Sequence, residues 1–96
     1  MRPYDLIVAG AGIIGAACAH AAAEAGLRVA VIEPGVIGGG ATAAGMGHLV
    51  ALDDVPAEVA LARDSLRLWE AYAARTEAEF HRCGTLWVAD DDAGMQ

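Results

Sequence analysis

The sequence is poor in basic residues. It has 6 lysine and arginine residues against 13 aspartate and glutamate residues, which gives a formal net charge of −7 at pH 7. The acidic side chains gather at residues 53–54 and 90–92, and we interpret both groups as solvated surface. A chain with this charge balance repels nucleic-acid phosphates and anionic lipid surfaces. We therefore expect no nucleic-acid partner.

Cysteine is also scarce. Cys18 and Cys83 stand alone without CxxC spacing, so the sequence shows no disulfide framework, and we expect a reducing cytoplasmic compartment. A metal site built on Cys18 with His20, or on His81 with Cys83, would need further ligands at the usual spacings, and the chain presents none. We therefore predict that the chain binds no metal.

Long uninterrupted apolar runs are missing. None reaches the roughly 20 residues that a membrane-spanning helix needs, so we expect no stable membrane insertion. Residues 6–19, LIVAGAGIIGAACA, look like the apolar part of a secretory signal. Three glycines interrupt this stretch, however, and a second apolar segment follows it directly, which favours a folded cytoplasmic chain over a signal peptide.

The first 33 residues have the pattern of a strand–helix–strand unit. Residues 4–9 form a short apolar run that ends at Gly10, which predicts a buried strand. Alanine dominates residues 13–25, which predicts a helix followed by Gly26 at its C′ position. Residues 27–33, LRVAVIE, predict a second strand that stops at Pro34. Two strands joined by a helix pair in parallel, so we expect a βαβ unit.

Residues 34–54 follow as a long loop rich in glycine and small side chains. Start signals at residues 54–58 then predict an amphipathic helix with a structural role. Its apolar stripe is Val59, Ala62, Leu66, Trp69 and Ala73, and its polar face is Glu58, Arg63, Arg67, Glu70 and Arg75. Residues 84–89, GTLWVA, predict a further strand.

Several side chains outside the loop are interpreted as structural. In the first helix, Ile14, Cys18, Ala21 and Ala25 share one face, which we expect to lie against the sheet, with Cys18 as a small buried side chain. His20 and Glu24 are four residues apart, so we expect a surface pair. Trp69 and Trp87 are most simply explained as packing residues.

The glycines between the first strand and the first helix carry the chemistry. Gly10, Gly12 and Gly15 fit G-x-G-x-x-G, and Glu33 ends the second strand about eighteen positions later. Gly10 permits the tight turn, Gly12 lets a pyrophosphate approach the main chain, and Gly15 lets the helix pack closely on the sheet. If the three glycines served only helix packing, neither the strand before them nor Glu33 after them would be explained. The motif therefore predicts a dinucleotide site.

Within this site, the N–H groups at the helix start would hold the phosphates, and Glu33 would accept hydrogen bonds from a ribose. A carboxylate repels a 2′-phosphate, and the next residue is Pro34 rather than an arginine, which disfavours NADP. The βαβ unit by itself does not choose between FAD and NAD, because both contain an ADP half.

Two features favour FAD: the motif begins near the N-terminus, and a second Gly-rich segment, GGGATAAGM at residues 38–46, follows the acid. With them the chain resembles the FAD-dependent oxidoreductases of the D-amino-acid oxidase and glycine oxidase superfamily over nearly its whole length. The stretches GGGATAAGMGHLVALDD and RCGTLWVAD look most like bacterial amine-oxidising members, such as the FAD subunits of D-hydroxyproline dehydrogenase and hydrogen cyanide synthase.

The resemblance implies an α/β fold that begins as a Rossmann-like FAD-binding domain. It implies that residues 1–54 bind FAD, and that residues 55–96 hold the amphipathic helix and the first strand of a substrate domain. The implied cofactor-binding residues are Gly10, Ala11, Gly12, Ile13, Ile14, Gly15, Glu33, Pro34, Thr42, Ala43, Ala44, Gly45 and Met46. Residues 42–46 would run beside the pyrophosphate, the ribityl chain and the flavin ring.

The implied reaction is removal of a hydride from an amino acid or related amine, with N5 of the flavin as acceptor and an imine as product. His48 and Met46 would lie near the flavin edge, where His48 is more simply a loop histidine than a catalytic one. No catalytic residue is assigned, because the family's carboxylate-binding residues lie further along the chain.

We expect the chain to be the incomplete N-terminal portion of such an enzyme, which by itself would bind FAD poorly and be inactive. It could serve as a subunit of a hetero-oligomeric dehydrogenase. Two alternatives stay open at this stage: an NAD-dependent dehydrogenase, and a non-catalytic nucleotide-binding fragment that pairs with another subunit.

Overall fold

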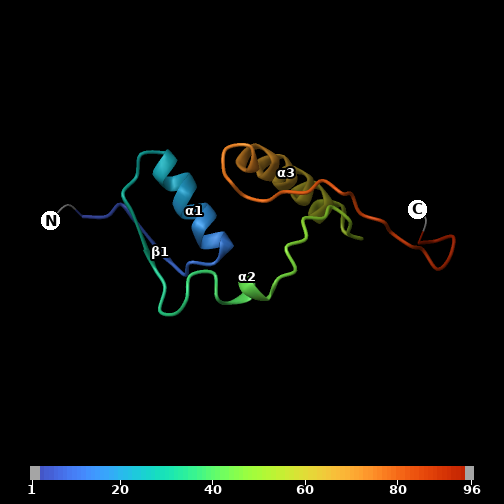
Figure 1. Cartoon of the computed structure of the whole chain (residues 1–96), viewed down its shortest axis with the longest axis horizontal. Coiled ribbons are helices and arrows are strands. Elements are labelled where there is room, and N and C mark those ends of the chain that lie inside the picture. Colours follow the sequence, from blue (N-terminus) through green and yellow to red (C-terminus); the bar gives the residue numbers. More distant parts are fainter. Residues whose placement is uncertain (1–2, 95–96) are drawn as a thin grey trace. The chain divides into compact units, whose positions relative to one another are not determined.

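The computed structural model describes residues 3–94. Along the chain the elements are β1 (Leu6–Ala9), α1 (Ile13–Glu24), β2 (Val29–Ile32), α2 (Ala41–Ala44) and α3 (Pro56–Ala73) (Figure 1). The structure divides into two units, Met1–Gly47 and His48–Gln96, and each is described by itself. Within the described range no helix combines the length and the apolar character needed to cross a membrane.

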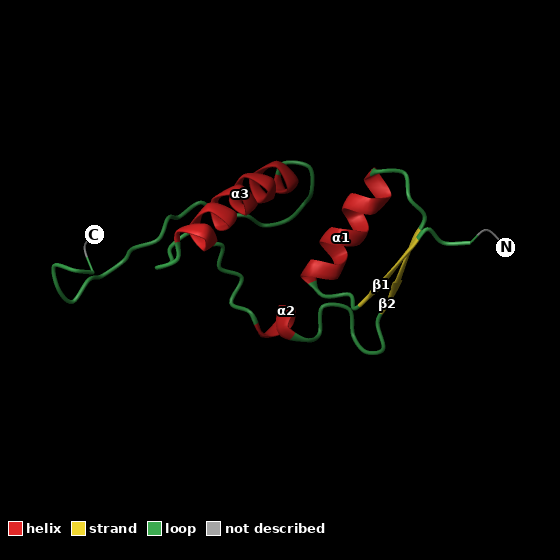
Figure 2. Ribbon diagram, turned by 180° about the vertical axis from the view of Figure 1, so that it is seen from behind, coloured by secondary structure: helices red, strands yellow, loops and turns green. Residues whose placement is uncertain are grey.

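The predicted βαβ unit is confirmed in the first unit. β1 and β2 pair in parallel, with Leu6 opposite Val29 and Ala9 opposite Ile32, and α1 connects them (Figure 2). Both strands are shorter than predicted. At their start, the Asp5 carboxylate accepts hydrogen bonds from the main-chain N–H of Arg28 at 2.9 Å and from its guanidinium at 2.7 and 3.0 Å. These side-chain bonds stand beside main-chain bonds at this end, where the N–H groups of Asp5 and Leu6 both donate to the Arg28 carbonyl, at 2.9 and 3.2 Å.

Helix α1 lies against the two strands through its smallest side chains. Gly15, Ala19 and Ala22 are half-buried, whereas Cys18 is exposed and Ile14 is 78% exposed. The prediction that Ile14, Cys18, Ala21 and Ala25 face the sheet is therefore wrong. A Cβ at Gly15 would run into the carbonyl oxygen of Gly10 and would lie 3.3 Å from a methyl group of Val8. Only the side of α1 that carries Gly15 can approach the sheet this closely.

The ends of α1 and its surface pair agree with the sequence. Ala25 is the C-cap, and Gly26 follows with a φ of 84°, a conformation that favours glycine. The N–H of Gly26 donates to the carbonyl of Ala23 at 2.9 Å. His20 and Glu24 form the predicted pair, with 3.6 Å between ring nitrogen and carboxylate.

The prediction that the first strand is buried is wrong: within residues 3–94, nothing covers the face of the sheet opposite α1. Side chains alternate along each strand, so Ile7 and Ile32 point away from the helix, and they are 61% and 57% exposed. Among the hydrophobic residues of the described range, Ala11 alone is buried, at 8% exposure. The best-covered position of the unit therefore lies in the glycine loop rather than in the strands.

The second unit is organised by α3. The predicted stripe of Val59, Ala62, Leu66, Trp69 and Ala73 is half-buried, and Arg63, Arg67 and Arg75 are exposed as predicted. Glu70 differs from the prediction because it is half-buried. After α3 the chain turns back and runs beside the helix (Figure 1).

The predicted strand at residues 84–89 is wrong. This segment has no strand conformation, and Leu86, Trp87 and Val88 are 89%, 64% and 76% exposed. A strand needs a partner for its main-chain N–H and C=O groups. Within the described part of the second unit no segment pairs with it, so an apolar, β-branched composition alone does not produce a strand. The prediction that Trp87 packs fails for the same reason.

Replacing Gly15 with alanine tests the close approach of α1 to the sheet. Alanine favours a helix by about 1 kcal/mol over glycine, so Gly15→Ala would stabilise an unconstrained helix. Because the new Cβ meets the Gly10 carbonyl, we expect Gly15→Ala to lower the free energy of unfolding by about 1–3 kcal/mol. Urea unfolding of the full-length protein measures this. The matched control is Gly45→Ala, where φ is −72° and ψ is 152°, an extended conformation open to alanine, and where a Cβ would make only ordinary contacts at 3.5 and 3.7 Å. An equal response of both variants would contradict the packing.

Candidate functional site

The loop between β1 and α1 turns at Gly10. Its φ of 102° is strained for any residue with a Cβ, and its N–H donates to the carbonyl of Ile32 at 2.8 Å. The loop therefore leaves the sheet where both strands end, and it brings Gly12 to the N-cap position of α1. The predicted glycine motif thus lies between the carboxyl end of the sheet and the start of a helix.

The start of α1 offers main-chain donors. The first bond within the helix runs from the N–H of Ala16 to the carbonyl of Gly12 at 2.9 Å, so the preceding N–H groups have no partner inside the helix. Gly12 provides no side-chain cap. The N–H of Ile13 instead donates to the hydroxyl of Thr42 at 3.0 Å. The remaining donors, together with the positive end of the helix dipole, suit an anion.

Glu33 joins the glycine loop to the segment after β2. Its Oε2 accepts a hydrogen bond from the N–H of Ala11 at 3.0 Å, and its Oε1 accepts one from the N–H of Gly35 at 2.9 Å. These two bonds, the Ala11 bond first, lower the pKa of the Glu33 carboxyl below its usual value. Glu33 is therefore ionised at neutral pH and lies beside the start of α1.

The second Gly-rich segment reaches the same place. The N–H of Gly38 donates to the carbonyl of Ala11 at 2.9 Å. Residues 41–44 then form the single turn α2, closed by the N–H of Gly45, which donates to the carbonyl of Ala41 at 3.1 Å. Met46 follows with its side chain 82% exposed. The segment that the sequence analysis predicts as a long loop thus contains a helical turn, and Thr42 lies in that turn.

The structure brings most of the predicted cofactor-binding residues into the first unit around one point. Hydrogen bonds join Ala11 to Glu33 and Ile13 to Thr42, and Pro34 lies between two of the bonded residues, Glu33 and Gly35. Ala43, Ala44 and Gly45 follow Thr42 in and after α2. Their predicted place beside the ribityl chain stays a prediction.

Sequence reasoning missed Gly35 and Gly38, which both donate main-chain hydrogen bonds in this network. Every residue except proline carries such an N–H group, so nothing in the sequence distinguishes the two that are used. The clustered glycines of residues 35–40 were the only available signal.

His48 belongs to the second unit. There it lines a hollow beside α3 together with Leu49, Val50, Ala62, Ser65, Leu66 and Trp69. Trp69 also contacts Tyr72 of the same helix edge to face, with ring centres 5.9 Å apart; its predicted role in core or interdomain packing stays a prediction. The predicted place of His48 near a flavin stays a prediction.

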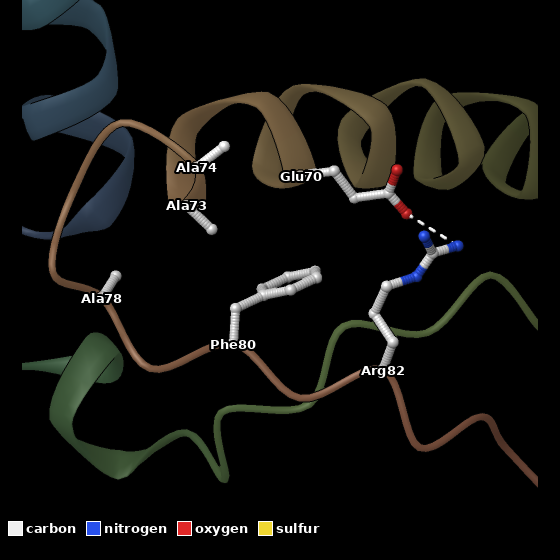
Figure 3. Close-up of a pocket in the computed structure, with 6 residues that line it drawn as sticks. All are labelled: Glu70, Ala73, Ala74, Ala78, Phe80 and Arg82. Atoms are coloured by element: carbon white, nitrogen blue, oxygen red, sulfur yellow. Dashed lines mark ion pairs between the residues drawn. The ribbon is translucent and has the colours of Figure 1, made fainter.

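A second, larger hollow of about 370 Å³ lies between α3 and the returning chain (Figure 3). Its lining residues are Glu70, Ala73, Ala74, Ala78, Phe80 and Arg82. Arg82 and Glu70 face each other across it, with 3.2 Å between guanidinium nitrogen and carboxylate oxygen. This ion pair accounts for the position of Glu70, whose side chain is 41% exposed while that of Arg82 is 74% exposed.

The geometry of the first unit fits a dinucleotide. A Cβ at Gly12 would lie 3.1 Å from the Thr42 hydroxyl oxygen, so glycine keeps open the space in front of the helix N–H groups. A carboxylate, main-chain donors and a hydroxyl surround that space, and such groups recognise a ribose and phosphates. Within residues 3–94 no cluster of three or more His, Cys, Asp or Glu residues has the arrangement of a metal site.

Comparisons with known proteins identify the family. The family model described as FAD-dependent oxidoreductase (DAO) matches residues 5–96. Glycine oxidase of Bacillus licheniformis is 50% identical over 48 residues, a stretch that makes up 50% of this chain and 13% of that protein. No solved structure matches the chain.

These matches confirm the resemblance seen in the glycine motif and in the second Gly-rich segment. The βαβ unit alone did not distinguish FAD from NAD. The family match does, because the family uses FAD. With its glycine loop, its ionised Glu33 and a match over residues 5–96, the chain belongs to the D-amino-acid oxidase family of FAD-dependent oxidoreductases.

Proposed function

We propose that the ADP half of FAD binds where the two Gly-rich segments meet in front of α1. The observation that carries this proposal is the joint placement of Ala11, Glu33 and Thr42 around the open side of Gly12. In this arrangement the pyrophosphate is held by main-chain N–H groups at the start of α1. The small side chains of residues 10–15 let the phosphate oxygens approach those groups closely.

Glu33 holds the adenosine ribose in this proposal. An ionised carboxylate has about four lone-pair positions, and the N–H groups of Ala11 and Gly35 use two of them. The carboxylate therefore keeps acceptor capacity for the two hydroxyl groups of a ribose. Because the loop bonds already fix its orientation, little side-chain freedom is lost when the sugar binds.

Residues 43–46 extend the site toward the flavin. Ala43, Ala44 and Gly45 carry at most a methyl group, so the main chain can approach the ribityl chain and the ring. Met46, which is 82% exposed, supplies an adaptable apolar side chain beside the ring. His48 has no assigned catalytic role in this proposal.

The proposed reaction is dehydrogenation of an amino acid or related amine of the glycine, D-amino acid or D-hydroxyproline type. When bound, FAD supplies the hydride acceptor at N5 of its flavin ring. The substrate loses a hydride from carbon and a proton from nitrogen, and water hydrolyses the resulting imine. The residues of this chain bind and orient the cofactor, and the name of the relative, glycine oxidase, supports the substrate class.

The proposed setting is a cytoplasmic flavoprotein, either as one polypeptide or as a subunit of a hetero-oligomeric dehydrogenase. Cys18 and Cys83 are both free and exposed, which suits a reducing compartment. The 48 matched residues span 13% of the glycine oxidase, so we propose the activity for the whole protein and not for this stretch alone.

Substitutions in the two halves of the site test cofactor binding. In the full-length protein we expect Gly12→Val to abolish FAD binding, because its side chain fills the phosphate space. We expect Glu33→Ala to weaken FAD binding about tenfold through loss of hydrogen bonds to a charged group. Titration of the cofactor-free protein with FAD measures both. The control is Glu79→Ala, a carboxylate that is paired with His81 in the second unit. Equal FAD affinity of Glu33→Ala and the control would contradict the assignment.

Reduction of the bound flavin tests the reaction. Under anaerobic conditions we expect the flavin absorption at about 450 nm to bleach on addition of glycine, D-alanine or D-hydroxyproline, because the substrate transfers a hydride to the flavin. L-alanine serves as the stereochemical control for D-alanine. A flavin that binds normally but is bleached by none of the three amines would refute the proposed substrate class while leaving the cofactor site intact.

A further inference from the structure

The larger hollow of the second unit has the size and the lining of a small-molecule site. Its volume of about 370 Å³ falls within the roughly 300–1,000 Å³ of sites that hold small ligands. Helix α3 lines it with Glu70, Ala73 and Ala74, and the returning chain lines it with Ala78, Phe80 and Arg82 (Figure 3). Two opposite charges and four apolar side chains thus share one hollow.

Glu70 lies at the negative end of the α3 dipole. The helix ends at Ala73, so Glu70 is in its last turn, and that turn contains no basic residue. The carbonyl groups of a helix C-terminus carry a partial negative charge that favours cations and disfavours a carboxylate. Arg82 compensates from the returning chain, with 3.2 Å between its guanidinium nitrogen and the Glu70 carboxylate oxygen. The carboxylate and the helix end together therefore attract a further positive charge.

Arg82 has donors for a second carboxylate. A guanidinium carries five N–H donors, more than one carboxylate uses, and the Arg82 side chain is 74% exposed. An exposed ion pair of this kind contributes little to stability. A ligand with both charges can therefore insert between Arg82 and Glu70 and replace their contact with two contacts of its own. The ligand carboxylate would gain short, charge-assisted hydrogen bonds from the guanidinium.

The rest of the lining is apolar. The Phe80 ring extends from the returning chain toward α3, and the three alanines lie around the end of the hollow beside it (Figure 3). Among the residues that the structure describes, Glu70 and Arg82 are the only polar side chains in this lining. A short apolar group placed against the ring and the alanine methyl groups leaves water, which favours its binding.

We propose that this hollow binds a free α-amino acid with a short apolar side chain. The ligand ammonium pairs with Glu70 at the end of α3, the ligand carboxylate pairs with Arg82, and the ligand side chain packs against Phe80. A plain amine or a plain carboxylic acid would separate the ion pair but satisfy only one of its two partners. The inference goes beyond the proposed function, because none of these residues belongs to the proposed cofactor site.

Saturation-transfer NMR of L-leucine with the full-length protein tests the site. L-Leucine has both charges and a short apolar side chain, and it lies outside the glycine and D-amino acid types of the proposed reaction. We expect saturable binding, with the strongest transfer to the leucine methyl groups. Isocaproate, which lacks the ammonium, and isoamylamine, which lacks the carboxylate, should each bind at least about tenfold more weakly.

Variants of the lining residues locate the binding. Glu70→Gln removes the partner of the ammonium and Arg82→Met removes the partner of the carboxylate, so each should weaken L-leucine binding about tenfold. Ala78→Trp keeps both charges and fills the hollow, so it should abolish binding. Arg67→Met is the matched control for Arg82→Met. Arg67 forms an exposed ion pair with Asp64 at 2.7 Å on the same helix and does not line the hollow, so this variant should bind L-leucine like the wild type.

Thermal unfolding checks that each variant is folded. If Glu70→Gln or Arg82→Met does not fold, Ala78→Trp and the two single-charge analogues decide the question. No saturable binding of L-leucine, equal binding of either analogue, or unchanged binding by the folded lining variants would each overturn the inference. A protein that binds L-leucine in this way but does not bind FAD would refute the proposed function and leave the amino-acid site intact.

Discussion

The hydrogen bonds from the Glu33 carboxylate to the Ala11 and Gly35 N–H groups are the interaction on which the site depends. They tie the glycine loop after β1 to the turn after β2, so the two strand ends present one surface. Because the folded-state pKa of Glu33 is lowered, its stabilising contribution is present above the usual glutamate pKa and is lost as the pH falls through the lowered value. At neutral pH the tie is intact.

This tie explains how a chain with few buried side chains can still define a binding site. Ala11 is buried between segments that meet through main-chain bonds, with Gly38 donating to its carbonyl and Glu33 accepting from its N–H. The site is thus built from backbone groups whose positions follow from local turns. Small side chains bring those groups near a ligand, and Glu33 and Thr42 add the only side-chain functions among these contacts. Such a site suits the ADP part of FAD, which presents phosphates and a ribose.

The sequence predicted the parts of this arrangement that follow from short-range rules. Gly10 must turn, Gly12 must precede the helix, and Glu33 must end the second strand, so their meeting at one sheet edge could be anticipated. The helix face was predicted wrongly, although His20 and Glu24 mark one polar side of an otherwise apolar α1. The deciding contact, between Gly15 and a carbonyl of the loop, is a backbone contact that residue type alone does not reveal. Residues 84–89 have a strand composition, but strand formation depends on a partner that composition does not reveal. The bond between Thr42 and Ile13 joins segments 29 residues apart, and no periodicity encodes it.

The most direct measurement of the central claim is an NMR titration of the Glu33 side-chain carboxyl carbon in the full-length, cofactor-free protein. The account predicts a pKa below the usual glutamate range, and it predicts that the amide resonances of Ala11 and Gly35 shift with the same midpoint. A Glu33 pKa at or above the usual range, or amide resonances that do not follow its titration, would contradict the claim that this carboxylate holds the two loops together.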